Sequence, residues 1–589
     1  MECNKQVQVV DDEQQVVSCH LKSASFDEIQ QRRSANYKPN IWQYDFLQSL
    51  PTIYDGVEYK LRAENLKENV KDIFVEAKDQ LAKLELIDII RKLGLGDVFA
   101  EETHKALQTV VSSMKNNKNG EEEELYMTAL RFKLLRLHGY DVSQDVFNAV
   151  SITKCSDIKG LLELFEASYL AFEGETILDE AKAFSMEALR NVYPTLDLNL
   201  AKEVAHALEL PMHWRVQWFD VKWRITMYET YNKNIDKRFL ELAKLNFNAV
   251  QAILQKDLRE ISRWWRDLRI MEGLNFTRDR LAESFLCSVG LTYEPQYSCF
   301  RKCLTKITTM ILIIDDVYDV YGSIEELEQF TEAVDRWDSS KTQDLPECMK
   351  TCFQALYDIT NEIASDIQEL NGWQVQALLH MRKAWTGFCK ALFVEAKWYN
   401  KVYSPSLEEY LSNALISSGA IVISIHSMLS VGSTDEKIIN LLGKDEDLVY
   451  NISIITRLYN DLGTSMAEKE RGDAPSSIHC YMREMNVSEK EAEEHIKSMI
   501  NNTWKKINGQ CLKNQSHNLL PCSFVKVTTN VARMVQCLYQ FGDGFGVQDQ
   551  ETRNHIISLL IEPFNLDNTA KDEENKGKKK SEGYSKVQI

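Results

Sequence analysis

Residues 308–322 read TTMILIIDDVYDVYG, and they place the carboxylates of Asp315, Asp316 and Asp319 directly after an apolar run. Carboxylates are costly in such a position unless another group compensates their charge. If the segment is helical, Asp315 and Asp319 share one face, about 6 Å apart along the axis, whereas Asp316 points elsewhere. A divalent cation would relieve the repulsion between the two facing carboxylates, and Mg²⁺ prefers such hard oxygen ligands. The stretch therefore predicts a helix that carries part of a magnesium site.

A second set of oxygen donors lies about 140 residues further on, in the segment IITRLYNDLGTSMAEKERGD. Asn460, Thr464 and Glu468 fall at i, i+4 and i+8, so an amide, a hydroxyl and a carboxylate share one helical face. Arg457, one turn earlier, extends this face and could meet a phosphate that the metal bridges. We expect the neighbouring Asp461 to support the metal ligands from behind or to have a structural role.

A third element is LNFTRDRLAESF, in which Arg278 and Arg280 flank Asp279. Arginine stays charged and offers paired donors that suit phosphate oxygens. The alternative for this element is a structural salt-bridge network. Each acidic cluster taken alone could likewise be a solvated surface, but two donor faces flanked by apolar residues, one of them with an arginine, favour a metal and phosphate site.

The composition fits a large helical protein. The chain has 589 residues, which is more than one core usually organises, and 10 prolines and 23 glycines are few for this length. The net charge of −19 argues against nucleic acid as a partner, because that binding depends on clustered lysines and arginines. The 13 cysteines show no paired metal-site spacing, so we expect reduced thiols.

The order of segments predicts two helical domains. We expect a disordered arm over residues 1–30, an N-terminal domain over 31–232, a C-terminal domain over 233–566, and a disordered charged tail over 567–589. Apolar spacing predicts helices that end near Gly94 or Gly96 and near Gly139, and a long helix whose buried face contains Val250, Leu254, Leu258, Ile261 and Trp265.

Neither a secretory signal nor a transit peptide is apparent at the N-terminus, so we expect a cytoplasmic protein. Residues 414–432 lack Asp, Glu, Lys and Arg and are long enough to span a bilayer. They also contain five serines, His426 and Gly419, which favour a buried helix interrupted at Ser418–Gly419 and no membrane association.

Together these motifs resemble those of the plant terpene synthases of the class I type, over nearly the whole chain. DDVYD at 315–319 is similar to the aspartate-rich motif of that family, and NDLGTSMAE at 460–468 is similar to its second metal motif. RDR at 278–280, and Arg32 and Arg33 with Trp42 downstream, resemble two further motifs. The mixed Asn, Thr and Glu donors differ from the second aspartate-rich motif of chain-elongating prenyltransferases, and the D-x-D-D motif of protonation-initiated cyclases is absent from the sequence.

The resemblance implies an all-α fold with an N-terminal helical barrel and a C-terminal helical bundle that holds the active site. It implies that Asp315 and Asp319 bind two Mg²⁺ ions and that Asn460, Thr464 and Glu468 bind a third, with Mn²⁺ as a substitute. Arg278 and Arg457 would bind the diphosphate of a prenyl diphosphate substrate. The arm around Arg32 and Trp42 would cover the active site, or would only clamp the domains together. We expect a monomer.

Within the family, segments such as RRSANYKPNIW, RVQWFDVKW and SSIHCYMRE resemble α-farnesene synthases. This implies that farnesyl diphosphate is ionised and deprotonated to an acyclic C15 product. Cys287 stands where many cyclising relatives carry Trp, and Phe545 where they often carry Tyr, so the pocket would offer fewer groups that stabilise a cation. The alternatives are a C10 or bifunctional synthase that makes ocimene, linalool or nerolidol, and a non-enzymatic helical scaffold.

Overall fold

The computed structural model describes residues 35–566, except 117–123, 149–156, 233–234, 275, 372–373, 432–435, 444–446, 472–475 and 518. Within these ranges every regular element is a helix, so the all-α expectation is confirmed. The segments 1–30 and 567–589, for which we expected disorder, lie outside the described residues.

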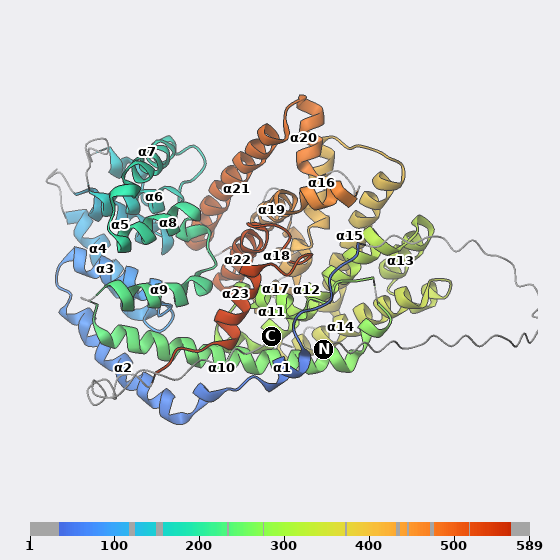
Figure 1. Ribbon diagram of the computed structural model, residues 1–589, viewed down its shortest axis with the longest axis horizontal. Coiled ribbons are helices and arrows are strands. Elements are labelled where there is room, and N and C mark those ends of the chain that lie inside the picture. The colour runs from blue at the N-terminus through green and yellow to red at the C-terminus, as the bar shows by residue number, and fades with distance from the viewer. Residues whose placement is uncertain are drawn as a thin grey trace, which may run out of the picture.

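The first group of helices lies at one end of the molecule (Figure 1). Its members are α3 (Gln80–Lys92), α4 (Ala100–Asn116), α5 (Leu125–Leu137), α6 (Ile158–Ser168), α7 (Thr176–Val192), α8 (Leu198–Glu209) and α9 (Gln217–Tyr231). The predicted helix ends are confirmed: Gly94 follows α3 with φ 71°, and Gly139 follows α5 with φ 79°. The left-handed backbone at these positions favours glycine.

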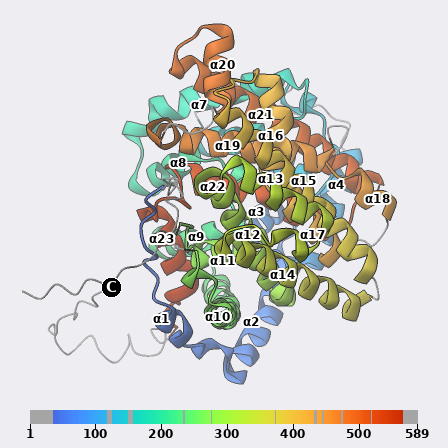
Figure 2. The same ribbon diagram turned by 90° about the vertical axis from the view of Figure 1, so that its right-hand side faces the viewer.

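Three helices run side by side along the base of the molecule (Figures 1 and 2). They are α1 (Tyr44–Ser49), α2 (Val57–Glu76) and the long α10 (Lys237–Leu268). The predicted buried face of α10 is confirmed, because Val250, Leu254, Leu258, Ile261 and Trp265 are all buried. Helices α11 (Leu281–Leu291) and α12 (Ser298–Asp316) pack against α10.

The second group of helices forms the other end of the molecule. Its members are α11 (Leu281–Leu291), α12 (Ser298–Asp316), α13 (Ile324–Arg336), α14 (Glu347–Asn371), α15 (Gln374–Asn400), α16 (Leu407–Ser417), α17 (Ala420–Val431), α18 (Glu436–Leu441), α19 (Leu448–Arg471), α20 (Ser477–Met485), α21 (Glu489–His517), α22 (Cys522–Tyr539) and α23 (Gln550–Ile556).

The two groups of helices pack against each other through an apolar interface. In α3, Leu84 and Ile87 belong to the core of the first group, whereas Leu86 and Ile90 belong to the larger core that continues into the second. Polar contacts also cross this interface; for example, Nζ of Lys505 on α21 lies 2.6 Å from Oδ1 of Asp179 on α7. The domain boundary at 232/233 stays a prediction.

Helix α12 ends differently from the regular helix that the sequence predicted. Its last residue is Asp316, and a π-helical turn, Val317–Tyr321, follows and contains Asp319. The chain then turns into α13, where the Ser323 hydroxyl accepts from the backbone N–H of Glu326 and the Glu326 side chain accepts from that of Ser323. This capping box fixes the exit of the chain after the acidic segment.

The predicted break in the serine-rich apolar segment is confirmed. Helix α16 ends at Ser417, α17 begins at Ala420, and Gly419 between them has φ 74°. The stretch Leu407–Val431 is long and apolar enough to cross a membrane by length and composition, but most of it is buried inside the protein. It packs against α12, α15, α19 and α22, as a core segment does.

Candidate active site

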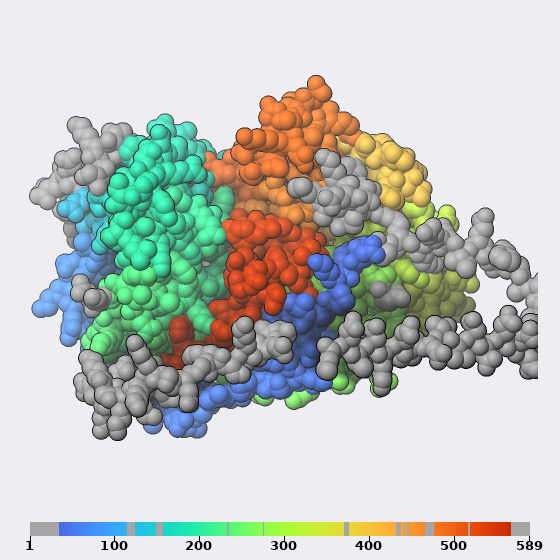
Figure 3. All heavy atoms as spheres, viewed as in Figure 1, coloured from blue at the N-terminus to red at the C-terminus, as the bar shows by residue number. Residues whose placement is uncertain are grey.

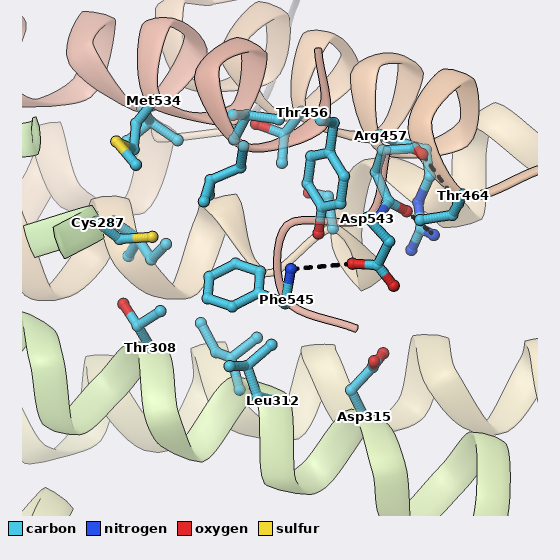
Figure 4. Close-up of a pocket in the computed structure, with 18 of the residues that line it drawn as sticks. Cys287, Thr308, Leu312, Asp315, Thr456, Arg457, Thr464, Met534, Asp543 and Phe545 are labelled. Atoms are coloured by element: carbon cyan, nitrogen blue, oxygen red, sulfur yellow. Dashed lines mark hydrogen bonds between the residues drawn. The ribbon is translucent and has the colours of Figure 1, made fainter. Parts of the chain in front are cut away.

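A pocket opens between α12, α15, α19, α22 and the break between α16 and α17. Figure 4 shows that its two ends differ in chemistry. Cys287, Thr308 and Met534 lie at one end, and charged and polar side chains gather at the other. The polar end contains Tyr37, Arg278, Asp315, Asp319, Arg457, Asn460, Thr464, Tyr539 and Asp543. Asp315 and Asp319 from the first predicted donor face, and Asn460 and Thr464 from the second, therefore meet at one cavity.

The three carboxylates that follow the apolar run of α12 have different surroundings. Asp315 and Asp319 line the pocket, and Asp319 is exposed to solvent. Asp316 is fully buried and does not line the pocket. Asp316 thus lies outside the pocket, as its expected place on another helix face suggests, and a π turn instead of a regular α-helical turn contains Asp319.

Arg278 fixes this arrangement from the segment that precedes α11. Its Nη2 lies 2.7 Å from Asp315 Oδ2 and 2.9 Å from Asp316 Oδ1, and its backbone N–H donates to Asp316 Oδ2 at 2.8 Å. Burial raises the pKa of Asp316 to about 6, although the Arg278 charge opposes the rise. The Tyr37 ring lies 5.1 Å from the guanidinium carbon of Arg278 and covers it.

On α19, Asn460 and Thr464 line the pocket opposite α12. The Thr464 hydroxyl donates to the Asn460 carbonyl oxygen at 2.9 Å, and the Asn460 side chain is hydrogen-bonded to Tyr539. Gly463 lets α19 approach α22 closely, since a Cβ there would lie 2.8 Å from the Cβ of Tyr539. Glu468 belongs to α19, but its side chain lies outside the described residues.

Arg457 also lines the pocket, and buried groups hold its guanidinium. Its Nη1 donates to Asn460 Oδ1 at 3.3 Å, and its Nη2 donates to the Ser417 hydroxyl at 2.9 Å. Ser417 donates in turn to Glu395 Oε1 at 2.5 Å. Burial raises the pKa of Glu395, and the Arg457 charge opposes this rise.

Asp461, next to Asn460, has the surroundings of a structural residue, which is one of the two roles that we expected. Its Oδ1 accepts from the Tyr410 hydroxyl at 2.9 Å, and its Oδ2 accepts from the backbone N–H of Ser477 at 2.9 Å. It is buried and does not line the pocket. Asp461 thus joins α16, α19 and α20 behind the site.

The N-terminal arm reaches the polar end of the pocket, and Figure 3 shows it on the surface beside the C-terminal segment. Arg280 does not line the pocket. It donates to the carbonyl oxygens of Lys38 at 3.0 Å and Phe545 at 2.8 Å, so it clamps the arm to the loop after α22. Trp42 is buried and donates to Glu283 at 3.0 Å. The arm therefore covers the pocket with Tyr37 and also clamps the N-terminal segment to the C-terminal helices. Arg32 and Arg33 lie outside the described residues.

Both positions that we linked to an acyclic product lie in the pocket. Cys287 of α11 is buried at the apolar end, and burial raises the pKa of its thiol, so it stays protonated. Phe545 lies in the loop after α22 and presents its ring to the cavity. A cation in this space would meet mainly sulfur, methyl and phenyl groups, together with the hydroxyl of Thr308.

Sequence reasoning missed three residues at the polar end: Tyr37, Tyr539 and Asp543. Asp543 accepts from the backbone N–H groups of Phe545 at 3.1 Å and Gly546 at 2.8 Å, which shapes the loop. Its only sequence signal was the DGFG segment, in which we singled out only Phe545. Tyr37 lies within NYKPN of the arm, where no periodic pattern indicates contact with a distant arginine.

The donors at the polar end suit a hard divalent cation. Among the described residues there is no group of three or more His, Cys, Asp and Glu side chains that could hold a metal. The Asp315 and Asp319 carboxylates on one wall, and the Asn460 amide and Thr464 hydroxyl on the other, are oxygen donors of the kind that Mg²⁺ shares with water and phosphate. Their chemistry fits a metal that binds together with a phosphorylated ligand.

Comparison with known proteins identifies the family. Residues 41–208 match "Terpene synthase, N-terminal domain", and residues 266–506 match "Terpene synthase family, metal binding domain". The chain is 53% identical to the α-farnesene synthase of Ricinus communis, over 94% of this chain and 99% of that protein. It is 54% identical to the (E,E)-α-farnesene synthase of Malus domestica, over 94% and 98%.

Among solved structures, the isoprene synthase of grey poplar (Populus x canescens), with three Mg²⁺ ions and dimethylallyl-S-thiolodiphosphate, is similar to most of this chain. It superposes with a TM-score of 0.81 at 40% identity, and the match covers 89% of this chain and 99% of that one. The metal-binding domain and this neighbour together support a divalent metal cofactor. The chain belongs to the terpene synthase family, and it is an enzyme with the two-domain all-α fold of that family.

Proposed function

We propose that this terpene synthase ionises (2E,6E)-farnesyl diphosphate and deprotonates the farnesyl cation to (E,E)-α-farnesene, with diphosphate as the second product. The observation that carries the proposal is the single pocket in which a polar end of arginines, carboxylates and neutral oxygen donors continues into an apolar end. Such a pocket fits a diphosphate that is attached to a hydrocarbon chain. The two relatives described above are both α-farnesene synthases, which supports the C15 substrate and the acyclic product.

At the polar end we assign Asp315 and Asp319 to one part of the metal site and Asn460, Thr464 and Glu468 to the other. Arg278 and Arg457 would bind the diphosphate oxygens, because a guanidinium offers paired, charged donors. Bound Mg²⁺ ions would neutralise the charge that develops on the leaving diphosphate. Three ions per site is our proposal, by likeness to the isoprene synthase complex, with Mn²⁺ as a substitute.

At the apolar end the pocket would protect the allylic cation from water. Tyr37 and the arm cover the polar end, and the walls beyond it are mostly apolar, with Thr308 as a neutral polar exception. The loss of a proton from the carbon chain places the electron pair in a new double bond. Because Cys287 and Phe545 offer neither an indole ring nor a phenol hydroxyl, deprotonation would precede ring closure.

Purified protein incubated separately with farnesyl and geranyl diphosphate, with Mg²⁺ present, tests this function. Gas chromatography with mass spectrometry should identify (E,E)-α-farnesene from the C15 substrate. Cyclic sesquiterpenes as the main product, or turnover of the C10 substrate to ocimene or linalool alone, would overturn the product assignment. A main product of nerolidol would show that water reaches the cation.

A monomeric state and a cytoplasmic location stay predictions. Sedimentation of the purified protein at several concentrations should give a single species near 68.1 kDa, the mass of one chain. A fluorescent fusion of the full chain in plant cells should give diffuse cytoplasmic signal, and a plastid pattern would contradict this.

A further inference from the structure

Glu395 is a buried carboxylate that lies behind the wall of the pocket. It belongs to α15, its side chain is 11% exposed, and it is not among the residues that line the cavity. Burying a carboxylate is unfavourable unless hydrogen bonds and an opposite charge compensate it. The groups that compensate Glu395 therefore indicate what it does.

A short chain of hydrogen bonds connects Glu395 to the polar end. Its Oε1 accepts from Ser417 Oγ at 2.5 Å and from Asn413 Nδ2 at 3.1 Å. The same Ser417 hydroxyl accepts from Arg457 Nη2 at 2.9 Å, and this Nη2 lies 3.9 Å from Glu395 Oε1. The hydroxyl thus donates to the carboxylate and accepts from the guanidinium, an orientation in which each bond strengthens the other.

The position of Ser417 suits this role. It is the last residue of α16, and the helix is interrupted at Gly419, two residues later. The break keeps Ser417 at the wall of the pocket, between α15 and α19. On the Arg457 side, Nη1 and Nη2 are engaged, whereas Nε is buried and has no hydrogen-bond partner within the described part of the chain.

We propose that Glu395 is a positioning residue that acts through Ser417 to orient the Arg457 guanidinium toward the diphosphate. This inference rests on the proposed function, because it takes diphosphate as the ligand of Arg457. A flexible arginine on α19 would sample many rotamers, and the carboxylate and hydroxyl reduce that freedom before the ligand binds. The preorganised charge then meets the diphosphate without reorganisation.

A purely structural role for Glu395 is the alternative. Through Asn413 and Ser417 the carboxylate also ties α15 to α16. Removal of Glu395 would destabilise the fold under either reading. The two readings differ in whether the effect on diphosphate binding passes through Arg457.

A double-mutant cycle separates them. Isothermal titration of inorganic diphosphate in the presence of Mg²⁺ would be measured for wild type, Glu395→Ala, Arg457→Ala and the double variant. Each single variant should bind diphosphate about tenfold more weakly, the loss expected for one charge-assisted hydrogen bond. The double variant should bind no more weakly than Arg457→Ala alone. Additive losses, or an unchanged affinity in Glu395→Ala, would overturn the inference.

Two further variants complete the design. Glu395→Gln keeps the oxygen that accepts from Ser417, so it should recover most of the affinity that Glu395→Ala loses. Glu166→Gln is the matched control, because Glu166 is buried in α6 and accepts from the backbone N–H of Met212 at 2.8 Å. It should lower the unfolding midpoint and leave diphosphate affinity unchanged.

Failure of this inference is distinguishable from failure of the proposed function. A wild type that releases diphosphate from farnesyl diphosphate but shows no coupling between Glu395 and Arg457 contradicts the inference alone. A wild type that binds diphosphate with the expected coupling but does not turn over farnesyl diphosphate contradicts the proposed function alone. No diphosphate binding by the wild type would overturn the inference.

Discussion

Arg278 and Asp316 form a buried pair in which one carboxylate accepts from both the side chain and the backbone of the arginine. Arg278 Nη2 lies 2.9 Å from Asp316 Oδ1, and the Arg278 backbone N–H lies 2.8 Å from Asp316 Oδ2. The pair holds Arg278 at the polar end and leaves Asp315 and Asp319 to line the pocket. Three aspartates in one short motif thus have two different tasks.

Asp316→Ala should therefore be destabilising. Removing one partner of a buried ion pair costs about 3 kcal/mol, and here the partly exposed Asp315 would be left to compensate the buried Arg278 charge. The midpoint of thermal unfolding should fall by several degrees, whereas Asp315→Asn, at a partly exposed position, should change it little. Differential scanning fluorimetry measures both, and equal midpoints for Asp316→Ala and wild type would show that the pair does not stabilise the fold.

Phe545→Tyr should change the product spectrum. The substitution adds one hydroxyl to the pocket wall with little change in shape, and this oxygen could stabilise a cation long enough for ring closure. We expect a measurable fraction of cyclic sesquiterpenes in the chromatogram. Cys287→Trp supplies a π face at the apolar end and should act in the same direction. An unchanged product profile in both variants would argue against the explanation of the acyclic product.

His426 should make stability fall in acid. It is buried on α17, its Nδ1 contacts the Val422 carbonyl oxygen at 2.8 Å, and burial lowers its pKa to about 4. Because the unfolded chain binds the proton near pH 6.5, unfolding takes up a proton between about pH 6.5 and 4. This group should lower the unfolding free energy by about 2 kcal/mol from pH 7 to pH 5. Between pH 7 and pH 5 the unfolding free energy of His426→Leu should therefore fall by about 2 kcal/mol less than that of wild type, as measured by denaturant titration. An identical fall in both proteins would contradict the lowered pKa of His426.

Val402→Gly should stabilise the protein. Val402 has φ 52° and is 89% exposed, and it stands at the left-handed position where α15 ends. The Tyr403 N–H donates to the Trp398 carbonyl oxygen, and the Val402 N–H donates to the Tyr399 carbonyl oxygen. In this pattern of helix termination, glycine usually occupies the position that Val402 has here. A β-branched residue is strained there, so glycine should raise the unfolding free energy by about 1 kcal/mol. A lower midpoint for the glycine variant would contradict this.

The sequence predicted the local features because they depend on neighbouring residues. Helix faces follow from apolar spacing, as in α10, and the break at Gly419 follows from a glycine inside an apolar run. The meeting of Asp315 with Asn460 followed from the family resemblance, and the structure places both in one pocket. Helical geometry alone predicted that Asp316 lies on a different helix face from Asp315 and Asp319.

The remaining features depend on segments far apart in the chain. Tyr37 reaches Arg278 across about 240 residues, and Glu395 reaches Arg457 through a serine on another helix. No local periodicity encodes such contacts. The π turn at Val317–Tyr321 was also missed, since a single added residue per turn leaves the apolar pattern of the preceding helix unchanged.

The most direct test of the central claim is the Mg²⁺ dependence of diphosphate release from farnesyl diphosphate. Wild type should release diphosphate only with a divalent cation present. Asp315→Asn on one wall and Asn460→Ala on the other should each lower turnover by at least about a hundredfold and raise the Mg²⁺ concentration needed for half-maximal rate, because each removes a metal donor. Release that continues in the presence of a chelator, or an unchanged Mg²⁺ requirement in both variants, would contradict the assignment of the two walls to one metal site.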